Sequence, residues 1–181
     1  MAIECKAKTG QGLYFDAEYS LTATGREDQA MVQENDDLLD ALNGLGCGVE
    51  KVEGGVLVSL PGDYDEFIFE RMGEWLYIGT TLMSPDEFED SGQIASLDRF
   101  MLTLQHRNLG CHFSYDGTGY LTIGAELCPE QQQADEVLHT MEHISFVIDA
   151  CLPLCDQVLA TGEIPDHPEV DRAFGLNEKL H

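Results

Sequence analysis

Four apolar runs separated by very short breaks constrain the fold of this 181-residue chain more than any other feature. The breaks consist of glycine, proline and charged residues, which are typical of turns. A parallel pair of strands needs a crossover of about a dozen residues, so strands joined by such short links must run antiparallel. The period-2 runs therefore predict an antiparallel meander, with strands at residues 48–52, 56–60, 67–71 and 75–82.

A β-hairpin and two helices are predicted beside the meander. Residues 111–115 and 120–127 flank Asp116-Gly117-Thr118-Gly119, a turn sequence that favours a hairpin. Leucines at helical spacing predict a first helix at residues 30–43. A second apolar stripe predicts another helix over residues 94–104, after an interruption at a glycine.

The most regular segment predicts a long amphipathic helix. Its apolar residues recur at spacings of three and four, which is the period of one helix face. Pro153 has no N–H to donate, so we expect it to kink the helix or to end it near Cys151. The apolar stripe consists of Ala134, Val137, Met141, Ile144, Ile148, Cys151, Cys155 and Val158.

The predicted fold class is α+β, with an antiparallel β-meander plus a hairpin in one sheet and helices packed on one face. We expect one domain over residues 30–159. Residues 13–21 alternate between apolar and polar, so residues 1–29 are interpreted as an N-terminal strand extension. Residues 160–181 show little periodicity and are expected to form a loosely docked tail.

The charge of the chain argues against several classes of partner. It has 9 Lys and Arg against 34 Asp and Glu, a formal net charge of −25. Such a surface repels phosphate backbones and anionic lipids, so we expect no nucleic acid and no membrane as partner. No export signal is recognisable, and no apolar run approaches the ~20 residues of a membrane span. We therefore expect a cytoplasmic protein with reduced cysteines.

The order of helix, meander, helix, hairpin and long helix resembles the type III secretion chaperone-like fold. The segments that carry the resemblance are 67–70, 74–78, 82–85, 97–107 and 119–127. Within that superfamily these segments are more similar to the YbjN- and YjfI-type bacterial proteins. The resemblance covers about residues 30–159 and is one of order and apolar pattern.

The resemblance implies a non-enzymatic, chaperone-like module. Chaperones of this group are usually homodimers that hold an extended partner segment on exposed apolar patches. We therefore predict a homodimer without cofactor that holds an unidentified protein partner on an apolar patch ringed by acidic residues. The YbjN- and YjfI-type relatives have no assigned chemistry, so a regulatory domain with no secretion role is an alternative. The long helix has more apolar positions than one contact needs, and the predicted partner or dimer surface on it is Met141, Ile144, Ile148 and Leu152.

A small metal-dependent hydrolase is the second alternative. His139-Thr140-Met141-Glu142-His143 matches H-x-x-E-H, in which His139 and His143 share a helix face and bind one metal while Glu142 activates water. No third ligand is identifiable, and a solvated helix face is the favoured interpretation. Cys151 and Cys155 lie on the apolar stripe and are interpreted as core residues rather than metal ligands.

Two further features have competing interpretations. Trp75 and Phe113 lie within predicted strands and are expected in the core. Residues 108–171 contain acidic residues but no Lys or Arg. A solvated acidic face that keeps the protein soluble is the favoured interpretation, and steering of a basic partner segment is the alternative.

Overall fold

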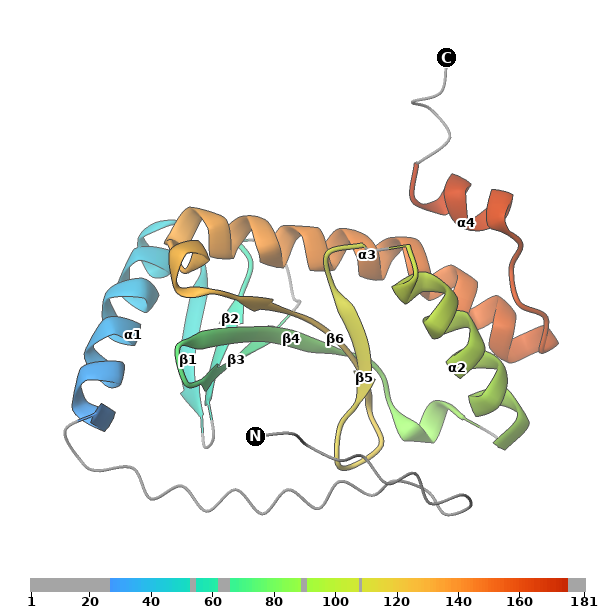
Figure 1. The fold of residues 1–181 in the computed structure, drawn as a ribbon, viewed down its shortest axis with the longest axis horizontal. Coiled ribbons are helices and arrows are strands. Elements are labelled where there is room, and N and C mark those ends of the chain that lie inside the picture. The colour runs from blue at the N-terminus through green and yellow to red at the C-terminus, as the bar shows by residue number, and fades with distance from the viewer. Residues whose placement is uncertain (1–26, 53–54, 62–65, 89–90, 108, 176–181) are drawn as a thin grey trace, which may run out of the picture.

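The described part of the chain forms a six-stranded sheet, four α-helices and two short 3-10 helices (Figure 1). The strands are β1 (Gly48–Val52), β2 (Gly55–Ser59), β3 (Glu66–Met72), β4 (Trp75–Met83), β5 (His112–Tyr115) and β6 (Leu121–Leu127). The helices are α1 (Glu27–Gly44), η1 (Pro85–Glu87), α2 (Ser91–Gln105), η2 (Pro129–Gln131), α3 (Ala134–Thr161) and α4 (His167–Ala173). The computed structural model describes residues 27–52, 55–61, 66–88, 91–107 and 109–175, with side chains in α1 from Asp36 onward.

All neighbouring strands pair antiparallel, in the order β1-β2-β3-β4-β6-β5. The first four form the predicted meander, and each observed strand end is within one residue of the predicted one. The β5–β6 hairpin joins this meander because β6 pairs with β4. The predicted α+β fold class, with one open antiparallel sheet and helices packed on it, is confirmed.

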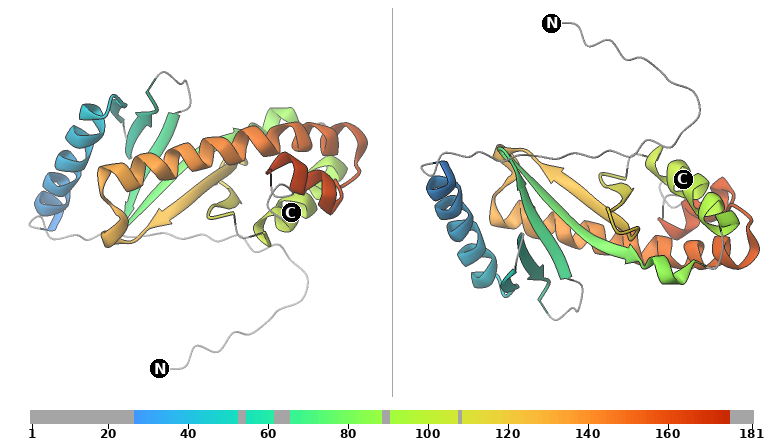
Figure 2. Two further views of the ribbon diagram at one scale, coloured as in Figure 1. Left: turned by 90° about the horizontal axis from the view of Figure 1, so that it is seen from above. Right: turned by 90° about the horizontal axis from the view of Figure 1, so that it is seen from below.

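α3 lies lengthwise over one face of the sheet and is in contact with the other three α-helices (Figure 1). It contacts β4 and β6, and α1, α2 and α4 all pack against it. α1 also contacts β1, and α2 also contacts β5, so these two helices stand at opposite ends of the sheet. Seen from below, the strands lie in front of α3, and no described helix crosses that side (Figure 2).

The core between α3 and the sheet is apolar, and no polar or charged residue is buried among the described residues. Met141 and Ile144 of α3 are fully buried, as are Phe67 of β3 and Ile78 of β4. Removing apolar side chains from water is the dominant favourable contribution to folding. This face of the sheet therefore holds the fold together, and the other face is free for another role.

α3 runs through Pro153 to Thr161, so of the two outcomes expected at this proline, a kink or an end near Cys151, the helix end is not observed. Pro153 leaves the carbonyl of Asp149 without its helical donor. Both residues are exposed, so water can bond that carbonyl. The helix ends at Gly162, whose φ of 71° is left-handed and whose N–H donates to the Val158 carbonyl.

The segment after α3 contains a short helix that the sequence pattern did not indicate. Asp166 caps α4 by accepting a hydrogen bond from its backbone. Val170 and Phe174 are buried in the core, and Asp171 forms an ion pair with Arg107 of the α2–β5 connection. The described part of the expected tail therefore contributes two side chains to the core, and how loosely the whole segment is docked stays a prediction.

Both shorter helices extend beyond their predicted ends. α1 begins at Glu27, before the predicted start at residue 30. α2 begins at Ser91 and runs through Gly92 without interruption. The strand predicted at residues 13–21, with the rest of the N-terminal extension before Glu27, lies outside the described residues.

α3 is the one helix among the described residues that is long and apolar enough to cross a membrane, by length and composition alone. A core helix of a globular domain meets the same two criteria. The side chains of α3 that are buried within this chain are Val137, Met141, Ile144, Val147, Ile148, Cys151, Leu154, Cys155 and Val158. This burial is the pattern of a core helix.

Candidate functional site

The predicted partner surface on α3 lies mostly in the core. Met141 and Ile144 are fully buried, and Ile148 is 8% exposed. Leu152 is half-buried against the core. Because α3 packs against three other helices as well as the sheet, it needs more apolar positions than a single contact stripe provides. Whether a second chain also reaches this helix stays a prediction.

The H-x-x-E-H residues do not converge on one site. The Nε2 of His143 donates to the carbonyl of Leu109 at 2.5 Å, which holds the ring against the loop before β5. The Nδ1 of His139 is 3.9 Å from a carboxylate oxygen of Glu142, and both side chains are largely exposed. Among the described residues, no group of three His, Cys, Asp or Glu is placed to hold a metal ion.

The cysteines near the end of α3 are core residues, as predicted. Cys151 and Cys155 are fully buried free thiols. Cys111 lies in the connection before β5, and burial raises the pKa of its thiol to about 11. A thiol in that state carries almost no thiolate at neutral pH, so Cys111 is a poor nucleophile.

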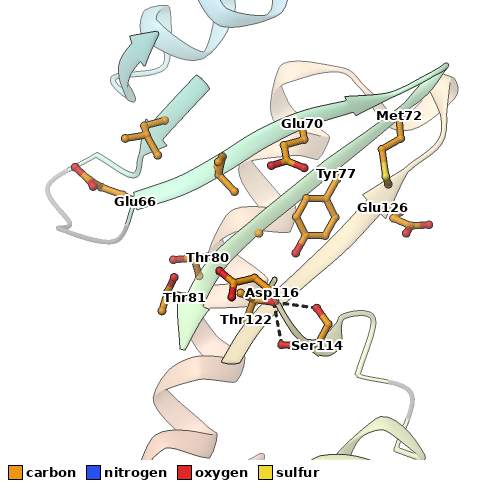
Figure 3. Close-up of a pocket in the computed structure, with 13 residues that line it drawn as sticks. Glu66, Glu70, Met72, Tyr77, Thr80, Thr81, Ser114, Asp116, Thr122 and Glu126 are labelled. Carbon is orange, nitrogen blue, oxygen red and sulfur yellow. Dashed lines mark hydrogen bonds between the residues drawn. The ribbon is translucent and has the colours of Figure 1, made fainter. Parts of the chain in front are cut away.

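A cavity of about 800 Å³ lies on the side of the sheet away from α3 (Figure 3). Side chains of β2, β3, β4, β6 and the β5–β6 hairpin line it, and none of these lining residues is Lys or Arg. We call this side the open face. Its apolar and aromatic residues are Leu57, Ile68, Met72, Trp75 and Tyr77, and its acidic residues are Glu66, Glu70, Asp116 and Glu126.

Strand register places Tyr77 between two carboxylates. Tyr77 on β4 is directly opposite Glu70 on β3 and directly opposite Glu126 on β6. Directly opposite residues share one face of the sheet, with Cβ atoms about 4.5–5.5 Å apart. Glu70, Tyr77 and Glu126 therefore form one row across three central strands, and Figure 3 shows the ring with a glutamate on either side.

Two glycines make room for the ring of Tyr77. Gly79 on β4 is directly opposite Gly124 on β6. A Cβ at Gly79 would lie 2.4 Å from the Tyr77 hydroxyl oxygen and 2.7 Å from Cε1. A Cβ at Gly124 would lie 2.6 Å from the same oxygen and 2.7 Å from Cε2. Since one ring edge is near each glycine, the ring lies flat across the two strands.

The surroundings of Tyr77 keep its hydroxyl protonated. Burial raises the pKa of Tyr77, and the charges of Glu70 and Glu126 raise it further, against a hydrogen bond with Thr122 that lowers it. Glu66, Glu70 and Glu126 are exposed, and none forms an ion pair with another described residue. Among the described residues, these three glutamates therefore have no cationic partner.

Asp116 differs from these glutamates because the hairpin turn uses its carboxylate. It accepts hydrogen bonds from the backbone N–H groups of Thr118 and Tyr120. Slight burial opposes ionisation of Asp116, but these bonds outweigh it and lower the pKa of the carboxyl. Asp116 closes the turn at one end of the cavity.

Trp75 is on the open face, so the expectation that it is a core residue is wrong. It is 47% exposed, and Met72, directly opposite it on β3, is 49% exposed. Trp75 has the same strand parity as Tyr77, which places both side chains away from α3. Phe113 is 6% exposed and belongs to the core as expected.

Sequence reasoning missed the open face, although β3 and β4 carry a signal for it. Ile68 is apolar between the core residues Phe67 and Phe69, and Tyr77 stands between Leu76 and Ile78. A strand with one solvated face alternates apolar and polar residues, whereas continuous apolar runs are typical of strands covered on both faces. Such runs in a sheet with helices on one face indicate an interaction surface on the other.

No protein-family model matches the chain, and no curated protein is significantly similar to it in sequence. Among solved structures, a chain of the ExsC-ExsE complex is similar, with a TM-score of 0.41, 12% identity, and coverage of 60% of this chain and 75% of that one. A chain of the HopA1-SchA chaperone-effector complex has a TM-score of 0.46 and 15% identity, covering 63% of this chain and 89% of that one.

Both TM-scores are low, so these likenesses give no information about what this chain binds. The observed order of helix, meander, helix, hairpin and long helix agrees with the layout predicted from the sequence. The closer similarity to the YbjN- and YjfI-type proteins stays a prediction.

Proposed function

We propose that this protein is a non-enzymatic, chaperone-like module that holds a segment of a partner protein on its open face. The observation that supports the proposal is the cavity of about 800 Å³ on this face, in which partly exposed apolar side chains stand beside carboxylates. In this proposal the predicted apolar patch is on the sheet rather than on α3. Leu57, Ile68 and Met72 contribute to the patch, and Glu66, Glu70 and Glu126 surround it.

The apolar content of the open face favours a binding surface over a merely solvated one. Met72 and Trp75 are each about half exposed and directly opposite each other. Leu57 and Ile68 are also directly opposite each other, and Ile68 lies four residues before Met72 along β3. Exposed apolar side chains that gather in one place mark interaction sites, whereas scattered ones do not.

The groups that line the cavity favour binding over catalysis. Its described lining contains no His, Cys or Lys, which are frequent general bases and nucleophiles. The raised pKa of Tyr77 keeps its hydroxyl protonated at neutral pH, so it cannot act as a base. Carboxylates, hydroxyls and apolar groups remain; such groups recognise ligands, and of these the carboxylates are also used as general acids and bases.

Site-specific photocrosslinking in the native cell tests this proposal. Benzoylphenylalanine replaces Met72 on the open face or, as the matched control, Phe146 on the solvent-exposed side of α3. The two residues are equally suitable because Met72 is 49% and Phe146 51% exposed. We expect irradiation to give an adduct with another protein at Met72 and none at Phe146, read by mass spectrometry of the purified adducts.

The masses of the adducts separate the competing explanations. Adducts at Phe146 alone, at a mass other than that of two copies of this chain, would show that the partner binds α3 and would refute the open-face proposal. An adduct of about 40 kDa at Met72, twice the 20.0 kDa of one chain, would mean that a second copy covers the open face. The predicted homodimer through α3 is compatible with the proposal, because α3 and the open face lie on opposite sides of the sheet.

A further inference from the structure

We propose that Glu70, Tyr77 and Glu126 form a cradle for a cationic side chain, Lys or Arg, of the partner segment. This inference rests on the proposed function, because it names the chemistry that the open face selects. Glu70 of β3 and Glu126 of β6 are each directly opposite Tyr77 of β4. We call these three residues the cation cradle.

The orientation of Tyr77 is the first argument for the cradle. Its ring lies flat on the backbone at Gly79 and Gly124, with one ring edge near each glycine. One face of the ring is therefore covered by the sheet, and the other is turned toward the cavity that Tyr77 lines. A Lys or Arg side chain within about 6 Å of such a ring centroid is attracted by the negative face of its π-system.

Charge complementarity is the second argument. Glu70 and Glu126 stand on either side of the ring and form no ion pair with another described residue. No Lys or Arg belongs to the residues that line the cavity. A cation on the ring face therefore meets two carboxylates and no Lys or Arg of the cavity lining, with the His112 ring 5.9 Å from the Tyr77 ring, whereas an acidic segment is repelled. Burial and both glutamates raise the pKa of Tyr77, which agrees with a negative field at the ring.

The spacing of the carboxylates favours an organic cation over a metal ion. Glu70 and Glu126 lie on the two strands that flank β4, so their backbones are about 9.6 Å apart, twice the usual strand spacing. The Tyr77 ring occupies the space between them. A metal ion needs oxygen ligands at about 2.0–2.6 Å, and no described group of three acidic, His or Cys residues provides them.

The neighbouring row of the open face predicts the sequence pattern of the partner. Ile68 lies two residues from Glu70 along β3 and is directly opposite Leu57, so an apolar row runs beside the cradle. Two residues of extended chain span about 6.6–6.8 Å. A partner segment that runs alongside the strands therefore places a basic residue in the cradle and an apolar residue two positions away on the apolar row.

Peptide binding by the full chain tests the cradle. The probe is a fluorescein-labelled peptide with three Lys-Ser-Leu-Ser repeats, in which lysine and leucine are two positions apart. Its control has acetyl-lysine at each lysine, which removes the charge and keeps the stem. Fluorescence anisotropy gives the Kd of both peptides, and we expect measurable binding of the lysine peptide alone.

Two double variants with the same net charge separate the cradle from the overall charge of the protein. E70Q/E126Q removes both carboxylates of the cradle. D149N/D156N removes two exposed carboxylates of α3 on the other side of the sheet. Two charge contacts of ordinary surface strength together change affinity about tenfold, so we expect E70Q/E126Q to weaken binding about tenfold and D149N/D156N less than about threefold.

Substitution of Tyr77 tests the contribution of the aromatic ring to peptide affinity, which does not depend on the net charge of the protein. Y77F keeps the aromatic face and should bind the lysine peptide like the wild type. Y77L removes that face and should weaken binding by about fivefold. Circular dichroism melts confirm that each variant is folded. If Y77L does not fold, the two double variants still decide the question.

Equal weakening by the two double variants would overturn the cradle, because it would show that only net charge attracts the peptide. Undetectable binding of the lysine peptide, or equal binding of the acetylated one, would overturn it as well. These outcomes are distinguishable from failure of the proposed function. If the cradle is wrong but Met72 still crosslinks to a partner, the open face binds a segment of different chemistry. If the adduct at Met72 is absent, the proposed function fails too.

Discussion

The two faces of the sheet are built from the same strands but differ in the kinds of side chain that they carry. Toward α3, alternate residues such as Phe67, Ile78 and Ile123 are fully buried in an apolar core. Away from α3, the intervening residues of the same strands combine Ile68 and Tyr77 with glycines and carboxylates. The composition of the covered face follows from the need for an apolar core. The composition of the open face is that of a binding surface.

The difference between the two faces shows that the residues of the open face are not those that would make the fold most stable. A face that serves stability needs only apolar volume, and any polar group there must be satisfied. On the open face, a paired Gly79 and Gly124 give up side-chain packing so that one ring can lie flat. Glycine in the interior of a strand weakens it, so this arrangement has a cost in stability.

Substitution of neighbouring residues on β3 tests this comparison most strongly. Phe67 is fully buried, and Ile68, the next residue, is half-buried on the open face. Phe67→Ala leaves a cavity in the core and should lower the free energy of unfolding by about 3–5 kcal/mol. Ile68→Ala should lower it by about 1 kcal/mol or less. Urea unfolding followed by circular dichroism measures both values.

Equal losses of unfolding free energy for Phe67→Ala and Ile68→Ala would contradict the difference between the two faces. They would mean that Ile68 is packed as firmly as Phe67, so the open face would be a second core rather than a binding surface. The slope of the unfolding free energy against urea serves as the control, because it should be the same for both variants if each unfolds from the same compact state.

The covered face was predictable from the sequence, because period-2 and period-3.6 apolar patterns report burial directly. The stripe that includes Val137, Met141 and Ile144 was assigned to one helix face, and all three are fully buried. The open face was not predictable in the same way. Glu70 and Tyr77 belong to one hairpin, but Glu126 is distant along the chain, and only the register of β4 and β6 brings it into the same row.

Other differences have equally local causes. Trp75 was assigned to the core because an isolated aromatic is usually buried, and only its parity relative to Tyr77 reveals that it faces away from α3. Pro153 was expected to kink α3 or to end it near Cys151, and the helix does not end there because water can satisfy the freed carbonyl at this exposed position. Helix α4 is short, and the buried Val170 within it and the buried Phe174 at its C-cap are too few to produce a periodic pattern.

Alanine at the paired glycines sharpens the comparison within the open face itself. Gly124→Ala puts a Cβ 2.6 Å from the Tyr77 hydroxyl oxygen, so the ring must leave its place on the sheet. Overpacking of this kind costs about 1–3 kcal/mol. Gly117→Ala is the matched control, because a Cβ there meets nothing within 4 Å and its cost should be near zero. Thermal or urea unfolding gives both values.

The cost of Gly124→Ala should depend on the tyrosine. In a Tyr77→Ala background the added Cβ meets no ring, and the substitution should become neutral or slightly stabilising, because alanine loses less entropy than glycine on folding. A double-mutant cycle measures this coupling. An unchanged cost in the Tyr77→Ala background would show that the backbone itself requires glycine, and the flat placement of Tyr77 would then have no structural basis.

The smallest expected effect is the contribution of Tyr77 on the open face to the loss of stability at alkaline pH. Burial and the charges of Glu70 and Glu126 raise the pKa of Tyr77 in the folded chain above its value in the unfolded chain. The contribution of this group is fully present below the unfolded pKa and is lost as the pH rises through the folded pKa. Stability should therefore fall as the pH rises above about 10, and Tyr77→Phe should lose less stability there than the wild type.

Tyr115, whose pKa burial and Asp98 also raise, titrates outside the cavity and is the matched control. Urea unfolding at pH 8 and at pH 11 compares Tyr77→Phe, Tyr115→Phe and E70Q/E126Q. If E70Q/E126Q loses as much stability between pH 8 and pH 11 as the wild type, the charges of the two glutamates do not affect the pKa of Tyr77. The two faces of the sheet would then differ less in electrostatic potential than the positions of these residues indicate.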